Sequence, residues 1–276
     1  MSLWYAVLLG LVQGLTEFLP VSSSGHLALT QAVLGVTPGL AFDVLLHVAT
    51  LVAVVVAYRQ EVVKLARATA SLVVPGTWKG EAAERRQQLS LLLALLIGSI
   101  PAGLAGVLLE DEVELLLASP RTIGLYFWAT SLFLLAADMV GRTRPVDRHA
   151  EIPTLGQSLL VGIAQAVAIF PGVSRSGSTI TAGLVAGLSR EGAARFSFLL
   201  SMPVIAGAGL LEAPEFVAAI SSSRDMLVFY LAGAFCALLA GYIAIRLLIR
   251  QVTRGRLLPF AVYLFVLGAL TLFYLR

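Results

Sequence analysis

Long apolar segments separated by short polar gaps dominate the sequence, and they restrict the chain to a membrane fold. Six segments have the length of one spanning helix, which needs about 17–25 residues: residues 41–58, 89–109, 122–140, 193–211, 226–249 and 257–275. The composition agrees, because 58% of the residues are hydrophobic and only 13% are charged, whereas soluble domains carry about 25% charged residues. We therefore predict an all-α integral membrane protein.

Two further apolar segments, residues 3–35 and 155–188, are too long for one span and are interrupted in the middle. The interruptions read PVSSSGH at residues 20–26 and PGVSRSGST at residues 171–179. Proline and glycine end helices, and serine begins new ones as an N-cap. The second arms, residues 25–35 and 177–188, are too short to cross the hydrocarbon core. We therefore expect two re-entrant helical hairpins in addition to six transmembrane helices.

The two interruptions are related by an offset of 152 residues. Seven of the 17 positions from Gly10 to His26 are identical at this offset, beginning with Gly10 and Gly162 and ending with Gly25 and Gly177. Three spans lie between the hairpins, so the second hairpin would enter from the opposite side of the membrane. We predict a single membrane domain over 1–276, made of inverted repeats at about 1–140 and 153–276, with both hairpin tips near the midplane. Such an arrangement usually forms a binding site at the membrane centre.

The basic residues predict the orientation of the chain. The gaps that include residues 59–88 hold 15 of the 19 basic residues, whereas the opposite gaps hold three and the acidic run 110–114. Basic residues mark cytoplasmic loops, so both termini and the opening of the first hairpin are expected on the outer side. This distribution also excludes a nucleic-acid binder, which would gather its basic residues on one exposed face. Cys236 is the only cysteine and forms no internal disulfide.

Three ionisable residues, Glu17, His26 and Arg175, lie at the two interruptions. An ionisable group at bilayer depth costs about 2.5–3.5 kcal/mol on insertion scales, so such groups usually serve function. Small polar residues and glycines surround them. The candidate substrate-binding residues are Ser22, Ser24, Gly25, Gly172, Ser174, Ser176, Gly177 and Thr179.

These residue types favour an anionic oxygen ligand such as phosphate. Each interruption leads into a helix N-terminus, where free backbone N–H groups attract anions, and Arg175 adds a fork of donors that matches phosphate oxygens. Glu17 and Gln13, four residues apart on one helix face, are candidate ligands of a divalent cation such as Mg²⁺. His26 is a candidate base, and Ser23 or a neighbouring serine is a candidate nucleophile or phosphate-holding hydroxyl.

Structural explanations compete with several of these roles. Serine and glycine in membrane helices often serve close packing, which applies to Ser22, Ser24, Ser176 and Gly177. Glu17 and Arg175 can instead be a structural ion pair between the hairpins. Gln165, the counterpart of Gln13, is expected to form hydrogen bonds across the hairpins. His47 and Asp43, one helical turn apart, are either an internal pair or part of the site.

The motifs QxxxEFLPVSSSGH at 13–26 and PGVSRSGST at 171–179 resemble the two signatures of the bacterial undecaprenyl-diphosphatase family, also called the bacitracin-resistance family. The resemblance covers nearly the whole chain. It implies a plasma-membrane phosphoric anhydride hydrolase that converts undecaprenyl diphosphate into undecaprenyl phosphate, the lipid carrier of cell-wall precursors. It also implies a divalent cation, Mg²⁺ or Ca²⁺, and resistance to bacitracin, which sequesters the same lipid.

The same resemblance assigns roles to single residues. Glu17 matches the essential acidic position, Arg175 the diphosphate-binding arginine, His26 the family histidine and Ser23 the serine proposed as nucleophile. Gln13 stands where many members have glutamate, so Glu17 is the only acid at the predicted site. Whether Ser23 or a water attacks stays open, and so does a homodimer. The architecture alone also fits a transporter or flippase of an anionic polyprenyl phosphate lipid, which is the rival prediction.

Overall fold

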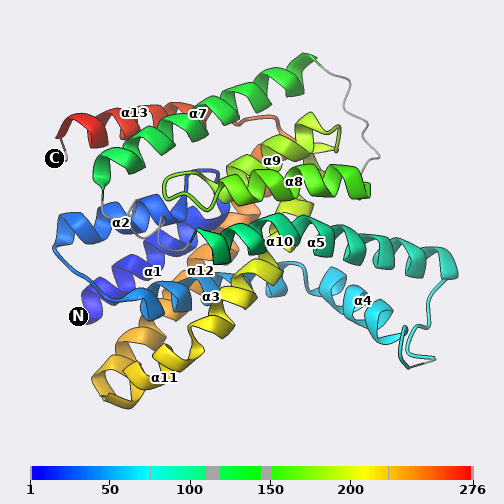
Figure 1. Cartoon of the computed structure of the whole chain (residues 1–276), viewed down its shortest axis with the longest axis horizontal. Helices are drawn as coiled ribbons and strands as arrows, with labels where there is room; N and C mark the ends of the chain where they lie inside the picture. Colours follow the sequence, from blue (N-terminus) through cyan, green and yellow to red (C-terminus); the bar gives the residue numbers. More distant parts are fainter. Residues whose placement is uncertain (1, 75, 110–118, 144–150, 223, 275–276) are drawn as a thin grey trace.

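The computed structural model describes residues 2–74, 76–109, 119–143, 151–222 and 224–274, and every regular element in these ranges is a helix (Figure 1). The first half contains α1 (Leu3–Phe18), α2 (Ser23–Leu34), α3 (Leu40–Ala57), α4 (Arg59–Ala70), α5 (Ala82–Leu108) and α7 (Pro120–Thr143). The second half contains α8 (Leu155–Val167), α9 (Arg175–Val185), α10 (Arg190–Leu211), α11 (Ala213–Ser222), α12 (Arg224–Thr253) and α13 (Leu258–Tyr274).

Five of the described helices, α3, α5, α7, α10 and α12, are long and apolar enough to cross a membrane. They coincide with five of the six predicted spans, which confirms an all-helical, multi-pass membrane protein. The sixth predicted span, residues 257–275, corresponds to α13, an apolar helix of 17 residues, and residue 275 lies outside the described ranges. The acidic run 110–114 and the basic loop at 144–150 also lie outside them.

Both interrupted segments form a helix, a break and a second helix, as the proline, glycine and serine residues predict. Helix α1 ends at Phe18 and α2 begins at Ser23, whereas α8 ends at Val167 and α9 begins at Arg175. The N-caps are equivalent, because Ser22 Oγ accepts the Gly25 N–H and Ser174 Oγ accepts the Gly177 N–H. The related sequences therefore make related local structures.

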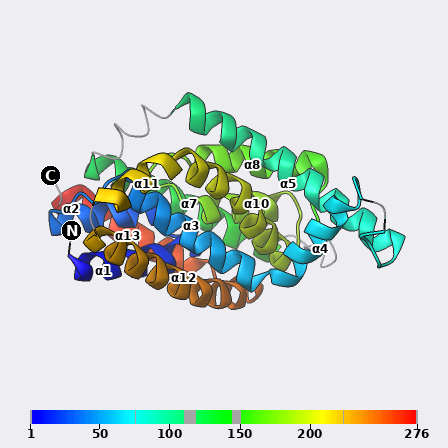
Figure 2. The same cartoon turned by 90° about the horizontal axis from the view of Figure 1, so that it is seen from below.

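Each hairpin packs its first arm against a long helix of the other half of the chain (Figure 2). Helix α1 crosses α12 where Gly10 meets Gly233, and α8 crosses α5 where Gly162 meets Gly98. At both crossings a Cβ on the hairpin glycine would collide with the backbone of the other helix. Small residues permit such close helix contacts in membranes. Gly10 and Gly162 correspond at the offset of 152 residues, so the two crossings are equivalent.

The helices run roughly along the long axis of the molecule (Figure 1). The start of α1 and the end of α13 lie at one end, and α4 lies at the opposite end. The largest apolar cluster lies between α3, α5, α10 and α12 and contains Phe18, Phe196 and Phe198. Phe18 packs edge to face on Phe198, with ring centroids 5.5 Å apart. This cluster fixes the position of the end of α1, and therefore the position of Glu17, the residue before Phe18.

Candidate active site

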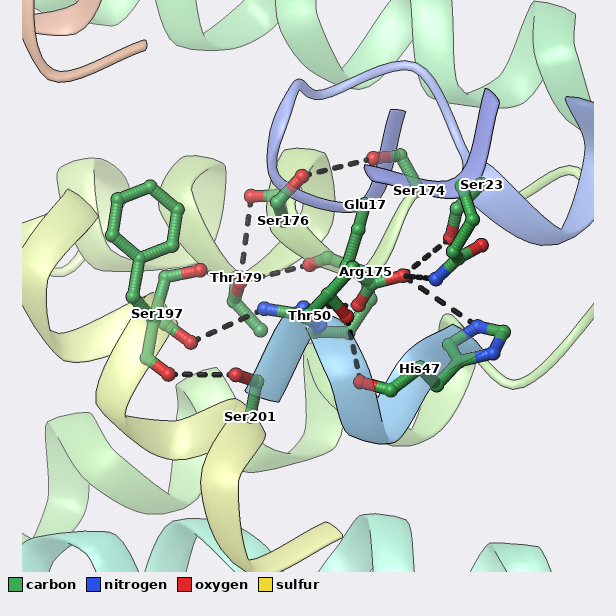
Figure 3. Close-up of polar contacts among 12 residues, drawn as sticks. Glu17, Ser23, His47, Thr50, Ser174, Arg175, Ser176, Thr179, Ser197 and Ser201 are labelled. Atoms are coloured by element: carbon green, nitrogen blue, oxygen red, sulfur yellow. Dashed lines mark hydrogen bonds and ion pairs between the residues drawn. The ribbon is translucent and has the colours of Figure 1, made fainter. Parts of the chain in front are cut away.

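Glu17 is the centre of the polar contacts in Figure 3, and it is buried, with 7% of its surface exposed. Its Oε2 accepts hydrogen bonds from Gln13 Nε2 at 2.8 Å and from Ser23 Oγ at 2.6 Å. Its Oε1 accepts one from Arg175 Nη2 at 2.6 Å. Burying a carboxylate is costly unless it is paired and hydrogen-bonded. The three donors come from both hairpins, so the site exists only where the hairpins meet.

Arg175 begins α9 and joins the second hairpin to the first. Its Nη2 contacts Glu17, and its Nη1 donates to the carbonyl of Ser197 on α10 at 3.3 Å. A second link lies beside it, because Ser176 Oγ donates to the Leu19 carbonyl at 3.1 Å. The guanidinium keeps some exposure, 17% for the side chain. The two interruptions thus meet, as the inverted-repeat prediction requires.

The backbone of Ser22 turns the chain so that Ser23 faces Glu17. Ser22 has φ +67°, and among the described residues it is the only non-glycine residue with positive φ. Such a conformation costs of order 1–3 kcal/mol and tends to occur at functional sites. The counterpart of Ser22, Ser174, has an ordinary φ of −74°. The strain is therefore specific to the hairpin that carries Ser23.

His26 does not contact Ser23 or Glu17 in this structure. Its Nδ1 donates to the Ser22 carbonyl at 2.7 Å, and its Nε2 lies 2.7 Å from the hydroxyl of Tyr263 on α13. The two rings also stack, with centroids 5.7 Å apart. Because the Ser22 carbonyl can only accept, Nε2 accepts the Tyr263 proton when the ring is neutral. The expected pairing of His26 with the Ser23 hydroxyl is not formed.

His47 on α3 is the histidine that reaches Glu17, at 3.5 Å from Nε2 to Oε2. Its Nδ1 donates to the Asp43 carbonyl at 2.8 Å, so Nε2 is directed to the carboxylate. Both residues line a cavity of about 440 Å³ between α2, α3 and the start of α7, together with Ser24 and Gln31. We call it the His47 pocket. The spacing of Asp43 and His47 was visible in the sequence, but nothing there placed His47 beside Glu17, and the Asp43 carboxylate accepts from Gln31 Nε2 instead.

The hydroxyls of Ser174 and Thr179 in the second hairpin are occupied by contacts within the fold, whereas the buried Ser178 hydroxyl has no hydrogen-bond partner in the described part of the chain. Ser174 caps α9, and its N–H donates to Thr130 Oγ1 at 3.0 Å. Thr179 Oγ1 donates to the Arg175 carbonyl at 2.8 Å and lies 2.6 Å from Ser197 Oγ. All of these side chains are buried. Of the predicted substrate-binding serines and threonines, Ser24 lines the His47 pocket.

Three predicted glycines lie in close contacts, two of which, at Gly25 and Gly172, leave no room for a side chain. A Cβ on Gly25 would lie 2.6 Å from the Phe127 ring, and one on Gly177 would lie 3.1 Å from Ser174 Cβ. Gly172 has φ +101°, which favours glycine, and lies against the backbone of Ile123. These glycines allow the two breaks and α7 to approach each other closely.

The residues around Gln13 are suited to a divalent cation that also binds substrate. Gln13 is fully buried and its Oε1 has no hydrogen-bond partner, although it belongs to the side chain that donates to Glu17. Mg²⁺ takes oxygen ligands, usually one or two carboxylates plus phosphates and water. Within the described ranges no group of three or more His, Cys, Asp or Glu side chains could hold a metal ion. The oxygen atoms available here for a cation are those of Glu17 and the unpartnered Oε1 of Gln13.

Gln165, the counterpart of Gln13, has a different environment. Its side-chain oxygen and nitrogen are both buried and have no hydrogen-bond partner in the described part of the chain. The prediction that Gln165 forms hydrogen bonds across the hairpins is wrong. Helix α8 packs against α5 and not against a polar residue of the first hairpin.

Comparisons with known proteins agree with the two motifs. A family model described as bacitracin resistance protein BacA matches residues 6–270. A protein of Rubrobacter xylanophilus named undecaprenyl-diphosphatase is 46% identical over 273 residues, 98% of this chain and 97% of the relative. Proteins of the same name from Moorella thermoacetica and Methanosphaera stadtmanae are 42% and 37% identical, over 100% and 97% of this chain and 100% and 96% of the relatives. The chain belongs to the bacitracin resistance protein BacA family.

Proposed function

We propose that this chain is an undecaprenyl-diphosphatase, which hydrolyses undecaprenyl diphosphate to undecaprenyl phosphate and inorganic phosphate. The observation that carries the proposal is the buried Glu17 carboxylate, which binds the Ser23 hydroxyl on one oxygen and the Arg175 guanidinium on the other. A candidate nucleophile (Ser23), a candidate base (Glu17) and a positively charged side chain that can bind phosphate (Arg175) are thus adjacent. The family and the names of the relatives support the same activity.

In the mechanism that we favour, Ser23 is the nucleophile and Glu17 is its base. Ser23 Oγ forms a bond to the terminal phosphorus while its proton passes to Glu17 Oε2, 2.6 Å away. The P–O bond of the anhydride breaks, and undecaprenyl phosphate leaves with the electron pair. A water oxygen then forms a bond to the phosphorus of the phosphoserine and its protons leave with inorganic phosphate, while the bond to Ser23 Oγ breaks and this oxygen recovers the proton from Glu17. His47, 3.5 Å from Glu17, helps to hold the carboxylate in place.

Arg175 would bind the diphosphate, because its planar fork matches phosphate oxygens and its side chain is still partly exposed. The helix N-terminus that begins at Ser23 points N–H groups at the same place. Glu17 and the unpaired Gln13 Oε1 would hold a divalent cation, Mg²⁺ or Ca²⁺, which would offset charge on the diphosphate when bound.

For the membrane arrangement we propose six spans and two re-entrant hairpins in one domain over 1–276, with inverted repeats at about 1–140 and 153–276. The equivalent glycine crossings of α1 on α12 and α8 on α5 support the repeat. The position of α4, with Arg59, Lys64 and Arg67, at the end opposite to the start of α1 supports cytoplasmic α4 and outer termini (Figure 1). The protein would thus act in the bacterial plasma membrane from the outer side and counter bacitracin.

The direct test is phosphate release by the purified full chain in detergent with undecaprenyl diphosphate. We expect release of one phosphate per lipid, loss of the activity on chelation with EDTA, and recovery on addition of Mg²⁺ or Ca²⁺. Movement of polyprenyl phosphate across vesicle membranes without hydrolysis would instead support the transporter. Phosphate release that continues after chelation would contradict the proposed divalent cation but not the proposed phosphatase activity.

A further inference from the structure

Helix α2 separates two cavities with different chemistry. Ser24, Gln31 and the residues between them at helical spacing face the His47 pocket. The opposite face of α2, with His26, Thr30 and Val33, faces a groove of about 490 Å³ between α1, α2 and α13, and Leu29 lines both cavities. We call it the α2–α13 groove. Its volume lies in the range of about 300–1,000 Å³ that is usual for ligand sites.

The groove has an apolar surface, because its few polar groups are paired within the protein. Thr30 Oγ1 donates to the His26 carbonyl at 2.7 Å, and Thr271 Oγ1 donates to the Leu267 carbonyl at 2.8 Å. His26 and Tyr263 satisfy each other. The remaining lining is aliphatic, with Leu8, Leu29 and Val33 on one side and Leu267 and Leu270 on the other. The His47 pocket instead contains the Asp43 carboxylate.

The equivalent space in the other half of the molecule is filled. Helix α13 ends the second half and α7 ends the first, and α7 packs along α9. Thr130 of α7 donates to the Gly172 carbonyl at 3.1 Å, and Thr181 of α9 donates to the Phe133 carbonyl of α7 at 3.4 Å. Seven of the 11 residues of α9 are buried, against three of the 12 residues of α2. The opening beside α2 is therefore a feature of the first hairpin alone.

We propose that the α2–α13 groove binds the first isoprene units of the substrate's polyprenyl chain. The inference rests on the proposed function. The groove begins at His26, one turn after Ser23 on α2, and Ser23 Oγ donates to Glu17. A lipid whose diphosphate lies at Glu17 would therefore have its chain start beside the N-terminus of α2, where the groove begins. Val33 and Leu270 are exposed on the outside of the helices, where lipid chains surround the protein. A hydrocarbon chain fits this lining because it needs no hydrogen-bond partner.

The test compares two tryptophan substitutions on α13. Leu270→Trp adds bulk to the groove, and Val262→Trp adds the same bulk to a side chain of similar exposure, 54% against 49%, that does not line it. With farnesyl diphosphate, Leu270→Trp should raise KM about tenfold, because burial of several carbon atoms is lost. Leu270 lies about two helical turns beyond Tyr263, the α13 residue that contacts His26, so the single isoprene unit of dimethylallyl diphosphate would not extend to it. With this substrate the KM of Leu270→Trp should change less than about twofold, and Val262→Trp should change neither value.

Equal KM values for both variants with farnesyl diphosphate would overturn the proposal. A changed oligomeric state of Leu270→Trp in detergent, with unchanged KM, would also overturn it and would make the groove an interface between two copies. Lack of phosphate release from any substrate by the unsubstituted protein would contradict the proposed function itself.

A second measurement needs neither a variant nor turnover. A farnesyl diphosphate analogue with a photoreactive group on its chain should label peptides from residues 23–34 and 258–274. Label confined to residues 40–47 would place the chain in the His47 pocket and overturn the proposal. Label that excess phospholipid removes, but that excess farnesyl phosphate leaves in place, would show an unspecific lipid site. That result would overturn the proposal as well.

Discussion

Hairpins α1–α2 and α8–α9 share a pattern of glycine, glutamine and serine residues, but they differ in what surrounds them. The first carries Glu17, Ser23 and a strained Ser22, and its second arm lies between two cavities. The second is enclosed by α7 and α10, and its Arg175 is the residue that reaches Glu17 of the other hairpin. In the proposed function, the first hairpin would therefore supply the reacting groups, and the second would hold the Arg175 guanidinium in place.

The largest expected effect is on the first hairpin. Glu17→Gln keeps the shape of the side chain and removes its charge, so Ser23 loses its base and Arg175 its counter-charge. We expect kcat for phosphate release to fall about 10²–10⁴-fold, as is usual when a general base is lost. The thermal unfolding temperature in detergent is the control for folding. Turnover within a few-fold of the unsubstituted protein would show that Glu17 is only structural.

The second largest effect is expected at Arg175, the residue of the second hairpin that contacts Glu17. Arg175→Lys keeps the charge but loses the fork that contacts Glu17 and the Ser197 carbonyl together. We expect kcat/KM to fall roughly 10²-fold, about 2.7 kcal/mol of transition-state binding. Steady-state kinetics with undecaprenyl diphosphate measure it. Full activity of the lysine variant would mean that only the charge matters and that the rigid placement of α9 is unnecessary.

A substitution at Thr130, which supports the second hairpin, should lower the stability of the protein. Thr130 donates to the Gly172 carbonyl and accepts the Ser174 N–H, and it is fully buried. Thr130→Val keeps the shape and leaves both groups without a partner, which costs about 1–3 kcal/mol. We expect a lower unfolding temperature, with kcat per folded molecule changed less than about twofold. An unchanged unfolding temperature would contradict the supporting role.

The smallest effect should distinguish the two glutamines. Gln165→Leu removes a buried amide that has no partner in the described part of the chain, so stability should stay equal or rise by up to about 1 kcal/mol. Gln13→Leu, its matched control, removes a donor to Glu17 and should lower activity. Thermal unfolding and phosphate release measure both variants. Equal losses of activity would show that the two hairpins contribute alike.

The sequence was informative where a residue is costly in lipid. Proline, glycine and serine at 20–26 and 171–179 end and restart helices by local rules, so both breaks were predictable. Glu17 and Arg175 could be predicted as site residues, because an ionisable group inside a membrane is energetically costly and usually serves function. Their ion pair was considered only as a structural alternative to roles at a substrate, and the structure forms it.

Other parts of the site depend on how each helix is rotated about its axis, which one sequence does not determine. His26 contacts Tyr263, 237 residues later, instead of Ser23. His47 reaches Glu17 because α3 packs beside α1. The hydroxyls of Ser174 and Thr179 were expected at a phosphate, and the structure uses them to cap α9 and to bind α10. These differences all come from tertiary packing.

The account depends on a single site built by both hairpins, and a double-mutant cycle of Glu17→Gln and Arg175→Gln tests it most directly. If the two residues act together on one diphosphate, the double variant should be no slower than the slower single variant, with a coupling free energy of about 1.4 kcal/mol or more. Losses of kcat/KM that multiply independently would show that the carboxylate and the guanidinium do not share a substrate, and they would contradict the account.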